Sequence, residues 1–211
     1  MVSSVHVVLN EVDANATFHC DALADLVPSA RRIDYPAGER FDPDKAEAVV
    51  LTGSTAGVYE RDVHPWIDEE EELIRSLVDR SVPILGVCFG HQLLNVALGG
   101  RVEPGAMTAG LVAADLADNP LFEDVEPAVP ALHGDRVCEI GDGLERIASA
   151  PHAEIFGTAH PDRPIWTVQF HPEITADMTD ALAAYDWQMN SFSWEEVTAG
   201  RVIWNFVRQI E

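Results

Sequence analysis

One cysteine in this sequence lies between two glycines, directly after an apolar run. The segment 83–92 reads PILGVCFGHQ, so Cys88 is flanked by Gly86 and Gly90. A strand that turns sharply through Gly-x-Cys-x-Gly into a helix is the thiol form of the nucleophile elbow, whose tight turn leaves no room for larger side chains. The helix N-terminus would favour the reactive thiolate. Cys88 is therefore a candidate nucleophile, although a structural cysteine at a strand end fits the same spacing.

A thiolate nucleophile needs a base, and one histidine lies in a suitable context. The segment 165–173, IWTVQFHPE, ends a predicted strand at His171, and Glu173 follows across a proline. Catalytic groups of open α/β sheets gather at such strand ends. A carboxylate bonded to one ring nitrogen would set the tautomer and the ring orientation. His171 and Glu173 are thus the candidate base and its orienting carboxylate; a surface turn is the alternative.

The other cysteines and histidines lack the spacing of a metal site. Cys20 and Cys138 form no Cys-x-x-Cys pair, and the eight histidines include no His-Glu-x-x-His segment. An odd number of cysteines indicates free thiols in a reducing compartment. We expect no metal and no cofactor, and we interpret Cys20 and Cys138 as small core side chains.

The strongly acidic charge bears on the partners of the chain. Its 211 residues include 36 acidic and 13 basic ones, the formal net charge is −23, and Lys45 is its single lysine. This composition argues against nucleic-acid binding through a basic face. Dispersed carboxylates with few lysines are typical of proteins from salt-accumulating halophiles, in which salt screens the repulsion. A merely acidic protein from an ordinary cell is the alternative.

The sequence predicts no membrane association. No apolar run approaches the roughly 20 residues needed to span a bilayer. The first residues, MVSSVHVVLNEV, lack the basic start and cleavage site of a signal peptide. We therefore expect a cytoplasmic protein.

Strands and helices alternate in the first half of the chain. Short apolar runs predict strands, and helical periodicity predicts helices between them. The strands are expected at 5–9, 32–35, 46–53 and 81–87, and the helices at 17–27, 66–80 and 90–100. This alternation predicts an α/β fold with an open, mostly parallel central sheet and helices on both faces.

The second half of the chain predicts meandering strands and two closing helices. The strands are expected at 136–140, 153–159 and 164–170, and the helices at 174–188 and 193–209. No linker, repeat or low-complexity tract separates these elements. We therefore expect residues 1–211 to form a single domain.

Two of the segments together resemble a known family. PILGVCFGHQLLNVALGGRV, followed later in the chain by VQFHPE, is similar to the motifs of class I (triad-type) glutamine amidotransferases. VVLTGSTAGVYE at 49–60 resembles the oxyanion loop of that family, and LHGDRV at 132–137 resembles its His-Gly-Asp segment. The resemblance covers residues 5–175. It implies a flavodoxin-like domain that hydrolyses the side-chain amide of L-glutamine.

The resemblance also implies roles for the matching residues. Cys88 would attack the amide and form a γ-glutamyl thioester. His171 would act as base and then as acid, and Glu173 would orient it. The backbone N–H groups of Gly53 and Phe89 would form the oxyanion hole.

The same resemblance implies a substrate-binding set. Gln92 would hold the substrate. The backbone of His133, Gly134 and Asp135 would bind the amino-acid end of glutamine.

Two segments depart from the GMP synthetase type of this family. That type usually has two glycines and a proline in its oxyanion loop, where this chain has GSTAG at 53–57. The segment VLNEVDANATF near the N-terminus also lacks the Gly-Gln signature of that type.

Ammonia released by an amidotransferase is used at a second active site. The sequence contains neither a phosphate-binding G-x-x-x-x-G-K-[ST] motif nor a dinucleotide-binding G-x-G-x-x-G motif after a strand. We therefore expect a GMP synthetase-like amidotransferase that supplies ammonia to a separate ATP-dependent synthetase subunit. The alternative is a γ-glutamyl peptidase or hydrolase without ammonia transfer. A regulatory binding module is disfavoured, because all three triad residues are present.

Overall fold

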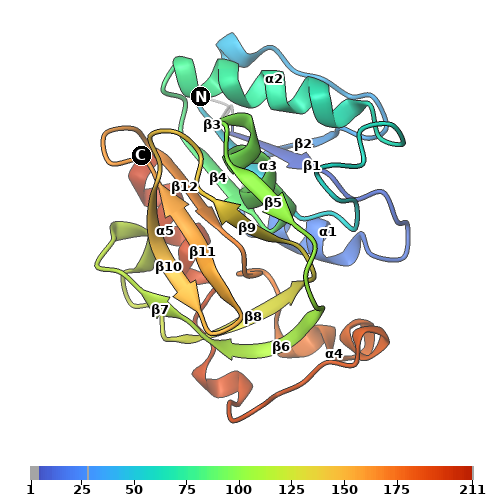
Figure 1. Cartoon of the computed structure of the whole chain (residues 1–211), viewed down its shortest axis with the longest axis vertical. Helices are drawn as coiled ribbons and strands as arrows, with labels where there is room; N and C mark the ends of the chain where they lie inside the picture. The colour runs from blue at the N-terminus through green and yellow to red at the C-terminus, as the bar shows by residue number, and fades with distance from the viewer. Residues whose placement is uncertain (1–4, 28, 211) are drawn as a thin grey trace.

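The parallel half of the central sheet carries the first strands of the chain. The structure, a computed structural model, describes residues 5–27 and 29–210. The parallel strands have the order β2-β1-β3-β4-β12. In Figure 1, β12 (orange) lies beside β4 (green), although the two strands are far apart in the chain. The bounds are β1 Val5–Leu9, β2 Arg31–Asp34, β3 Ala48–Leu51, β4 Ile84–Val87 and β12 Ile165–Val168.

The sheet continues beyond β12 with antiparallel strands. β11 pairs with β12, β10 with β11, and β7 with β10, while β9 bridges β11 to β5. β6 and β8 form a separate antiparallel ribbon. The bounds are β5 Arg101–Glu103, β6 Thr108–Ala113, β7 Asp115–Leu116, β8 Ala128–His133, β9 Arg136–Glu139, β10 Glu145–Ala150 and β11 Ala153–Ala159. The meandering strands predicted for this region are present as β9, β11 and β12.

Helices cover both faces of the sheet. Successive residues of β1 point to opposite faces, because side chains alternate along a strand. Val7 belongs to the core cluster that includes side chains of α1 and α5. Val8 belongs to the cluster that includes side chains of α2 and α3. The bounds are α1 Phe18–Asp25, α2 Trp66–Asp79, α3 Phe89–Ala97 and α5 Arg201–Ile210.

The closing segment differs from the prediction. A continuous helix over 174–188 was wrong, because the chain forms only one α-helical turn, α4 (Thr179–Leu182), between the 3₁₀ turns Ala176–Met178 and Ala183–Tyr185. The backbone of Gln188 instead bonds to Ala109 and Leu111 of β6. The second helix begins at Arg201 rather than at 193, after an extended Val197. At Gln188, hydrogen bonds to β6 thus take the place of helical ones.

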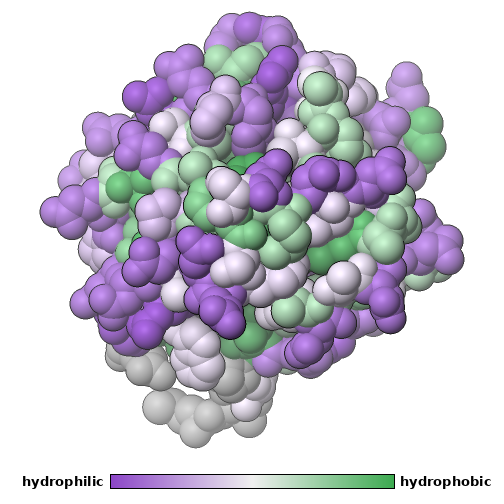
Figure 2. Space-filling view, turned by 90° about the horizontal axis from the view of Figure 1, so that it is seen from below, coloured by the Kyte–Doolittle hydropathy of each residue, from purple (hydrophilic) through white to green (hydrophobic). Residues whose placement is uncertain are grey.

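The surface is largely hydrophilic. Figure 2 shows one face whose rim is mostly hydrophilic, with hydrophobic residues gathered toward its middle. Exposed arginines pair with carboxylates, as Arg201 does with Asp124 and Arg208 with Glu123. Such exposed pairs contribute little to stability. Within residues 5–27 and 29–210, no helix combines the length and apolar character needed to cross a bilayer.

Candidate active site

Functional side chains follow the C-terminal ends of neighbouring parallel strands. Glu11 lies just beyond β1, Gly53 beyond β3, Cys88 beyond β4 and His171 beyond β12. Ligands of open α/β sheets bind at this edge. A pocket of about 280 Å³ opens there. It is lined by Glu11, Ala16, His19, Ser54, Thr55, Ala56, Gly57, Tyr59, Glu60, Cys88, Gln92, Met107, Leu132, His133, Gly134, Asp135, His171 and Tyr185.

Cys88 occupies a strained turn between β4 and α3. Its φ is 52° and its ψ is −104°. A residue with a side chain rarely adopts a positive φ, and such strain is often found at functional sites. The Cys88 N–H donates to the carbonyl of Val168 at 2.9 Å, and the Gly90 N–H donates to the carbonyl of Thr52 at 3.1 Å. These bonds tie the turn to β12 and to the end of β3.

The glycines on each side of Cys88 are required by space. A Cβ atom on Gly86 would lie 2.6 Å from the carbonyl oxygen of Gly90. A Cβ atom on Gly90 would lie 2.6 Å from the carbonyl oxygen of Leu51. Both contacts are with backbone, which cannot turn aside as a flexible side chain can. The turn therefore has the geometry expected of a nucleophile elbow.

Glu173 fixes the imidazole of His171. His171 Nδ1 lies 2.6 Å from Glu173 Oε1, and its Nε2 lies 3.2 Å from the carbonyl oxygen of Leu132. A carboxylate and a carbonyl accept hydrogen bonds, so both ring nitrogens are placed to donate, as they do in an imidazolium. Cys88 Sγ lies 3.8 Å from the same Leu132 oxygen. The thiol and the ring therefore converge on one carbonyl of β8.

The surroundings of His171 favour its charged form. Burial opposes the charge, but the Glu173 carboxylate, which is bonded to the ring, and the nearby Cys88 sulfur raise the pKa of His171 well above its usual value. The structure thus brings together the three residues of the predicted triad. Such a site can hold a thiolate–imidazolium pair.

The predicted oxyanion donors lie behind the pocket wall. Gly53 and Phe89 are buried, and their neighbours Ser54 and Cys88 line the pocket. In the part of the chain that the structure describes, neither the Gly53 N–H nor the Phe89 N–H donates to another backbone group. Their role as oxyanion donors stays a prediction.

The predicted substrate-binding residues contact one another. Gln92 Nε2 donates to the carbonyl of Asp135 and to Gln169 Oε1, each at 3.1 Å. His133 Nδ1 lies 2.9 Å from the same Asp135 carbonyl, which accepts its hydrogen. Gly134 lies between them and also lines the pocket. Gln92 thus holds the segment 133–135 in place as well as facing the pocket.

Histidines on this side of the pocket are neutral. Burial, opposed by the bond to the Asp135 carbonyl, lowers the pKa of His133 to about 4. His133 Nε2 lies 3.1 Å from His152 Nε2, and one neutral ring can donate to the other. Burial also lowers the pKa of His91 to about 3, and His91 Nδ1 lies 2.7 Å from Thr167 Oγ1.

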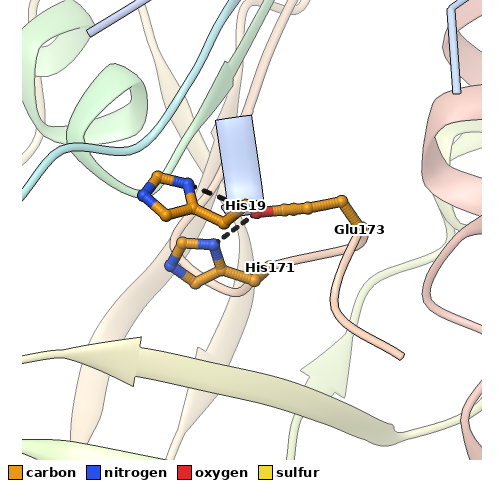
Figure 3. A group of neighbouring side chains, drawn as sticks. All are labelled: His19, His171 and Glu173. Carbon is orange, nitrogen blue, oxygen red and sulfur yellow. Dashed lines mark hydrogen bonds and ion pairs between the residues drawn. The ribbon is translucent and has the colours of Figure 1, made fainter. Parts of the chain in front are cut away.

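A second carboxylate–imidazole pair lies beside the first, and no sequence motif predicts it. Glu11 Oε2 lies 2.9 Å from His19 Nε2, and His19 Nδ1 lies 3.8 Å from Glu173 Oε1. The rings of His19 and His171 meet edge to face at 5.4 Å. Figure 3 shows the Glu173 carboxylate reaching toward both rings. The available signal was the position of Glu11 directly after a predicted central strand.

His19, His171 and Glu173 are also the residues that could hold a metal ion. Their ligand atoms lie within 4.8 Å of one another. A zinc ion would lie about 2.1 Å from each ligand and hold the ligands roughly 3.3 Å apart. The 2.6 Å between His171 Nδ1 and Glu173 Oε1 is instead the length of a direct hydrogen bond. The geometry fits proton sharing better than metal binding.

The other two cysteines differ in burial. Cys20 is buried with 2% of its surface exposed, and its Sγ lies 3.0 Å from Thr52 Oγ1. Cys138 is only half-buried, so its interpretation as a core side chain was wrong. On β9 the neighbouring Val137 faces the core, and alternation turns Cys138 to the other side.

The sequence is similar to amidotransferases of known families. It matches the family model described as "Glutamine amidotransferase class-I" over residues 15–187. The GMP synthase [glutamine-hydrolyzing] of Gibberella zeae is 32% identical over 173 residues, which cover 72% of this chain and 30% of that protein. The GMP synthase [glutamine-hydrolyzing] of Clostridium novyi is 30% identical over 205 residues, which cover 90% and 38%, respectively. This chain thus spans 30 to 38% of the length of these two relatives.

The fold is similar to solved amidotransferase structures. A glutamine amidotransferase from Thermotoga maritima has a TM-score of 0.76 and 20% identity, with 100% of this chain and 98% of that chain covered. A glutamine amido transferase from Methylobacillus flagellatus has a TM-score of 0.78 and 18% identity, with 100% and 96% covered. These likenesses confirm the predicted flavodoxin-like α/β fold. Because the family model matches most of its length, this chain belongs to the class-I glutamine amidotransferase family.

Proposed function

We propose that this protein hydrolyses the side-chain amide of L-glutamine and supplies the ammonia to an ATP-dependent synthetase. One observation carries the proposal. Cys88 sits in a strained elbow, its Sγ and His171 Nε2 converge on the Leu132 carbonyl oxygen, and Glu173 holds the imidazole ring at 2.6 Å. This is the arrangement of an activated nucleophile, its base and an orienting carboxylate.

The first half of the reaction forms a thioester. The Cys88 thiolate attacks the amide carbon, and the amide oxygen becomes an oxyanion. We expect the N–H groups of Gly53 and Phe89 to donate to it. The His171 imidazolium gives its proton to the departing nitrogen, so ammonia leaves and a γ-glutamyl thioester stays on Cys88.

The second half regenerates the enzyme. Neutral His171 takes a proton from water, and the resulting hydroxide attacks the thioester carbon. The tetrahedral intermediate collapses, glutamate leaves, and the thiolate reforms beside the imidazolium. Glu173 stabilises the charged ring at the end of each cycle and keeps Nε2 directed toward the sulfur.

Acidic groups near the pocket mouth complement the ammonium group of glutamine. Glu60 and Asp135 line the pocket, and its described lining includes no lysine or arginine. Burial raises the pKa of Asp135, while a hydrogen bond from the Tyr59 hydroxyl opposes that shift. The backbone N–H groups of the segment 133–135 are suitable donors for the α-carboxylate of the substrate.

The GMP synthase relatives support a synthetase as the ammonia acceptor. Both relatives are named for glutamine-dependent GMP synthesis, and this chain matches part of each. A GMP synthetase-like partner is therefore our first candidate for the acceptor site. If ammonia is transferred, the partner should form its product from glutamine in the presence of the wild type. It should not do so in the presence of Cys88→Ala.

A γ-glutamyl peptidase or hydrolase is the second candidate function, and two exposed side chains that line the pocket support it. Tyr59 and Met107 line the pocket while 51% and 63% of their surfaces are exposed. These apolar side chains would contact a leaving group larger than ammonia. Such an enzyme would use the same thioester but release a peptide or an amine.

The test compares glutamine with γ-glutamyl peptides as substrates of the wild type and of Cys88→Ala. Because the net charge is −23, the assay should extend from low to molar salt. We expect glutamate and ammonia from glutamine, with a loss of at least about 1,000-fold in Cys88→Ala. Glutamine cleavage that survives this substitution would overturn the mechanism. Preferential cleavage of γ-glutamyl peptides would favour the second candidate.

A further inference from the structure

The two segments that depart from the GMP synthetase type contact each other. Glu11, from the segment after β1, accepts hydrogen bonds from the N–H and the hydroxyl of Thr55 in the loop 53–57. The N–H lies 3.2 Å from Oε1 and 3.1 Å from Oε2 of Glu11. A carboxylate from outside the loop therefore restrains the middle of the loop. In this chain the restraint does not come from a proline within the loop.

The carboxylate that holds Thr55 is itself held by an imidazole. The side chains of His19 and Glu11 are 5% and 2% exposed, and they meet at 2.9 Å. Burial opposes both charges, but hydrogen bonds to Cys20 and Glu11 raise the pKa of His19 to about 10. Bonds from His19 and Thr55 keep the pKa of Glu11 below its usual value. Buried ion pairs seldom add net stability, so a structural role alone explains this one poorly.

The same imidazole also faces the triad. His19 Nδ1 lies 3.8 Å from Glu173 Oε1, on the side opposite the contact with Glu11. Gly53 fits between the two rings, because a Cβ atom there would lie 3.0 Å from His19 Cε1 and 3.1 Å from His171 Cε1. The start of the oxyanion loop therefore touches both imidazoles. His19 thus lies between the carboxylate that holds the loop and the carboxylate of the triad.

We propose that Glu11 and His19 are positioning residues that hold the oxyanion loop at Thr55 in register with the His171–Glu173 pair. This inference rests on the proposed function and adds to it how the oxyanion loop is held in position. Glu11 acts on the donors that meet the oxyanion in the transition state. It should therefore influence kcat more than KM and leave the nucleophile itself unchanged.

The first test is a double-mutant cycle between Glu11 and Thr55. Glu11→Ala should lower kcat about 10- to 100-fold, as the loss of a supporting contact does at other sites, with KM changed less than about threefold. Thr55→Val should lower kcat less, because its N–H remains. The double variant should be no more than about threefold worse than Glu11→Ala. If the kcat losses of the two single variants multiply in the double variant, the proposal is overturned.

A second measurement separates loop positioning from damage to the nucleophile or the fold. Iodoacetamide alkylation of Cys88 reports the thiolate without requiring the oxyanion hole. In Glu11→Ala its rate should stay within about threefold of the wild type while kcat falls. Equal losses of alkylation and turnover would contradict the proposal. Asp13→Asn is the matched control, because Asp13 lies in the same segment and, among the residues that the structure describes, its side chain bonds only to Asn15.

The role of His19 is tested by rescue. His19→Ala should lower kcat about 10- to 100-fold, and His19→Gln, whose amide can donate to Glu11 in place of Nε2, should recover part of that loss. Equal activity of the two variants would overturn the role of His19. An active wild type whose Glu11→Ala variant keeps its kcat would overturn the inference alone. A wild type that is inactive on glutamine and on γ-glutamyl peptides would overturn both the inference and the proposed function.

Discussion

The histidines on the two sides of the pocket have pKa values shifted in opposite directions. On the carboxylate side, formed by Glu11, His19, His171 and Glu173, each imidazole faces a carboxylate, and the pKa of each ring is raised against burial. On the neutral side, His133 faces a backbone carbonyl and another imidazole, and burial lowers its pKa. The residue type and the burial are similar on both sides. The neighbouring group therefore decides whether an imidazole is charged.

The difference assigns different tasks to the two sides. An imidazolium next to a thiol can exchange a proton with a leaving group, which a ring with a pKa of about 4 cannot do at neutral pH. The neutral His133 ring, bonded to the Asp135 carbonyl, instead fixes the backbone that is predicted to meet the substrate. We therefore expect substitutions on the carboxylate side to change kcat and its pH dependence. Substitutions on the neutral side should change KM.

The largest effect is expected from Glu173→Gln, which removes one of the two carboxylates of the carboxylate side, the one that bonds to His171. kcat should fall about 1,000- to 10,000-fold, because the imidazolium loses its partner and the ring its orientation. Loss of the negative charge lowers the pKa of His171, so the thiolate is less stabilised and Cys88 alkylation should shift to higher pH. Alkylation rates between about pH 5 and 10 measure this shift. An unchanged profile would refute it, and Glu123→Gln at the surface is the control.

The next effect compares one glycine from each side. Gly53→Ala places a Cβ atom 3.0 and 3.1 Å from the two charged imidazoles, whereas Gly134→Ala meets only the Gly105 carbonyl oxygen at 3.6 Å. Displacement of the rings should lower kcat about 100-fold in Gly53→Ala, since small misplacements of catalytic groups are costly. The kcat of Gly134→Ala should stay within about threefold of that of the wild type. Steady-state kinetics of the two variants decide the comparison, which fails if both lose activity equally.

The sequence predicts the parts of this molecule that depend on local rules. The elbow around Cys88 is visible because a tight turn demands small residues at fixed spacing, and the alternation of strands and helices predicts the parallel sheet. The contact of Glu11 with His19 and Thr55 could not be predicted, because it joins three segments that meet only after folding. The segment 174–188 was misread for a related reason. Its periodicity is helical, but its backbone bonds to β6, which lies far away in the sequence.

A smaller effect is expected on the neutral side. His133→Ala removes the Nδ1 bond to the Asp135 carbonyl, so the segment that is predicted to meet the amino-acid end of the substrate should loosen. KM should rise about 10-fold, the equivalent of one hydrogen bond, with little change in kcat. His133→Asn places an amide donor near the position of Nδ1 and should restore most of the affinity. The pH profile of kcat should match the wild type in both variants, and a shifted profile would mean that His133 takes part in proton transfer.

The smallest effect on activity is expected from Glu70→Gln. Glu70 is a third buried carboxyl, and its surroundings sharpen the comparison. Unlike Glu11, Glu70 has no cation in contact: Asn10 donates to its Oε1 at 3.0 Å, and its Oε2 has no partner among the described residues. Burial therefore raises the pKa of Glu70 from 4.5 to about 8. Between these values the unfolded chain loses the proton and the folded chain keeps it, so the free energy of unfolding should fall as pH rises.

Glu70→Gln removes this titration while keeping the bond from Asn10. The variant should be more stable than the wild type by a few kcal/mol above about pH 8 and similar to it near pH 5, with turnover changed less than about threefold. Urea unfolding at both pH values measures the difference. A wild type whose stability does not fall over this range would show that Glu70 is ionised in the folded state. The contrast with Glu11 would then be lost, because a buried carboxyl would hold its charge here without an imidazolium beside it.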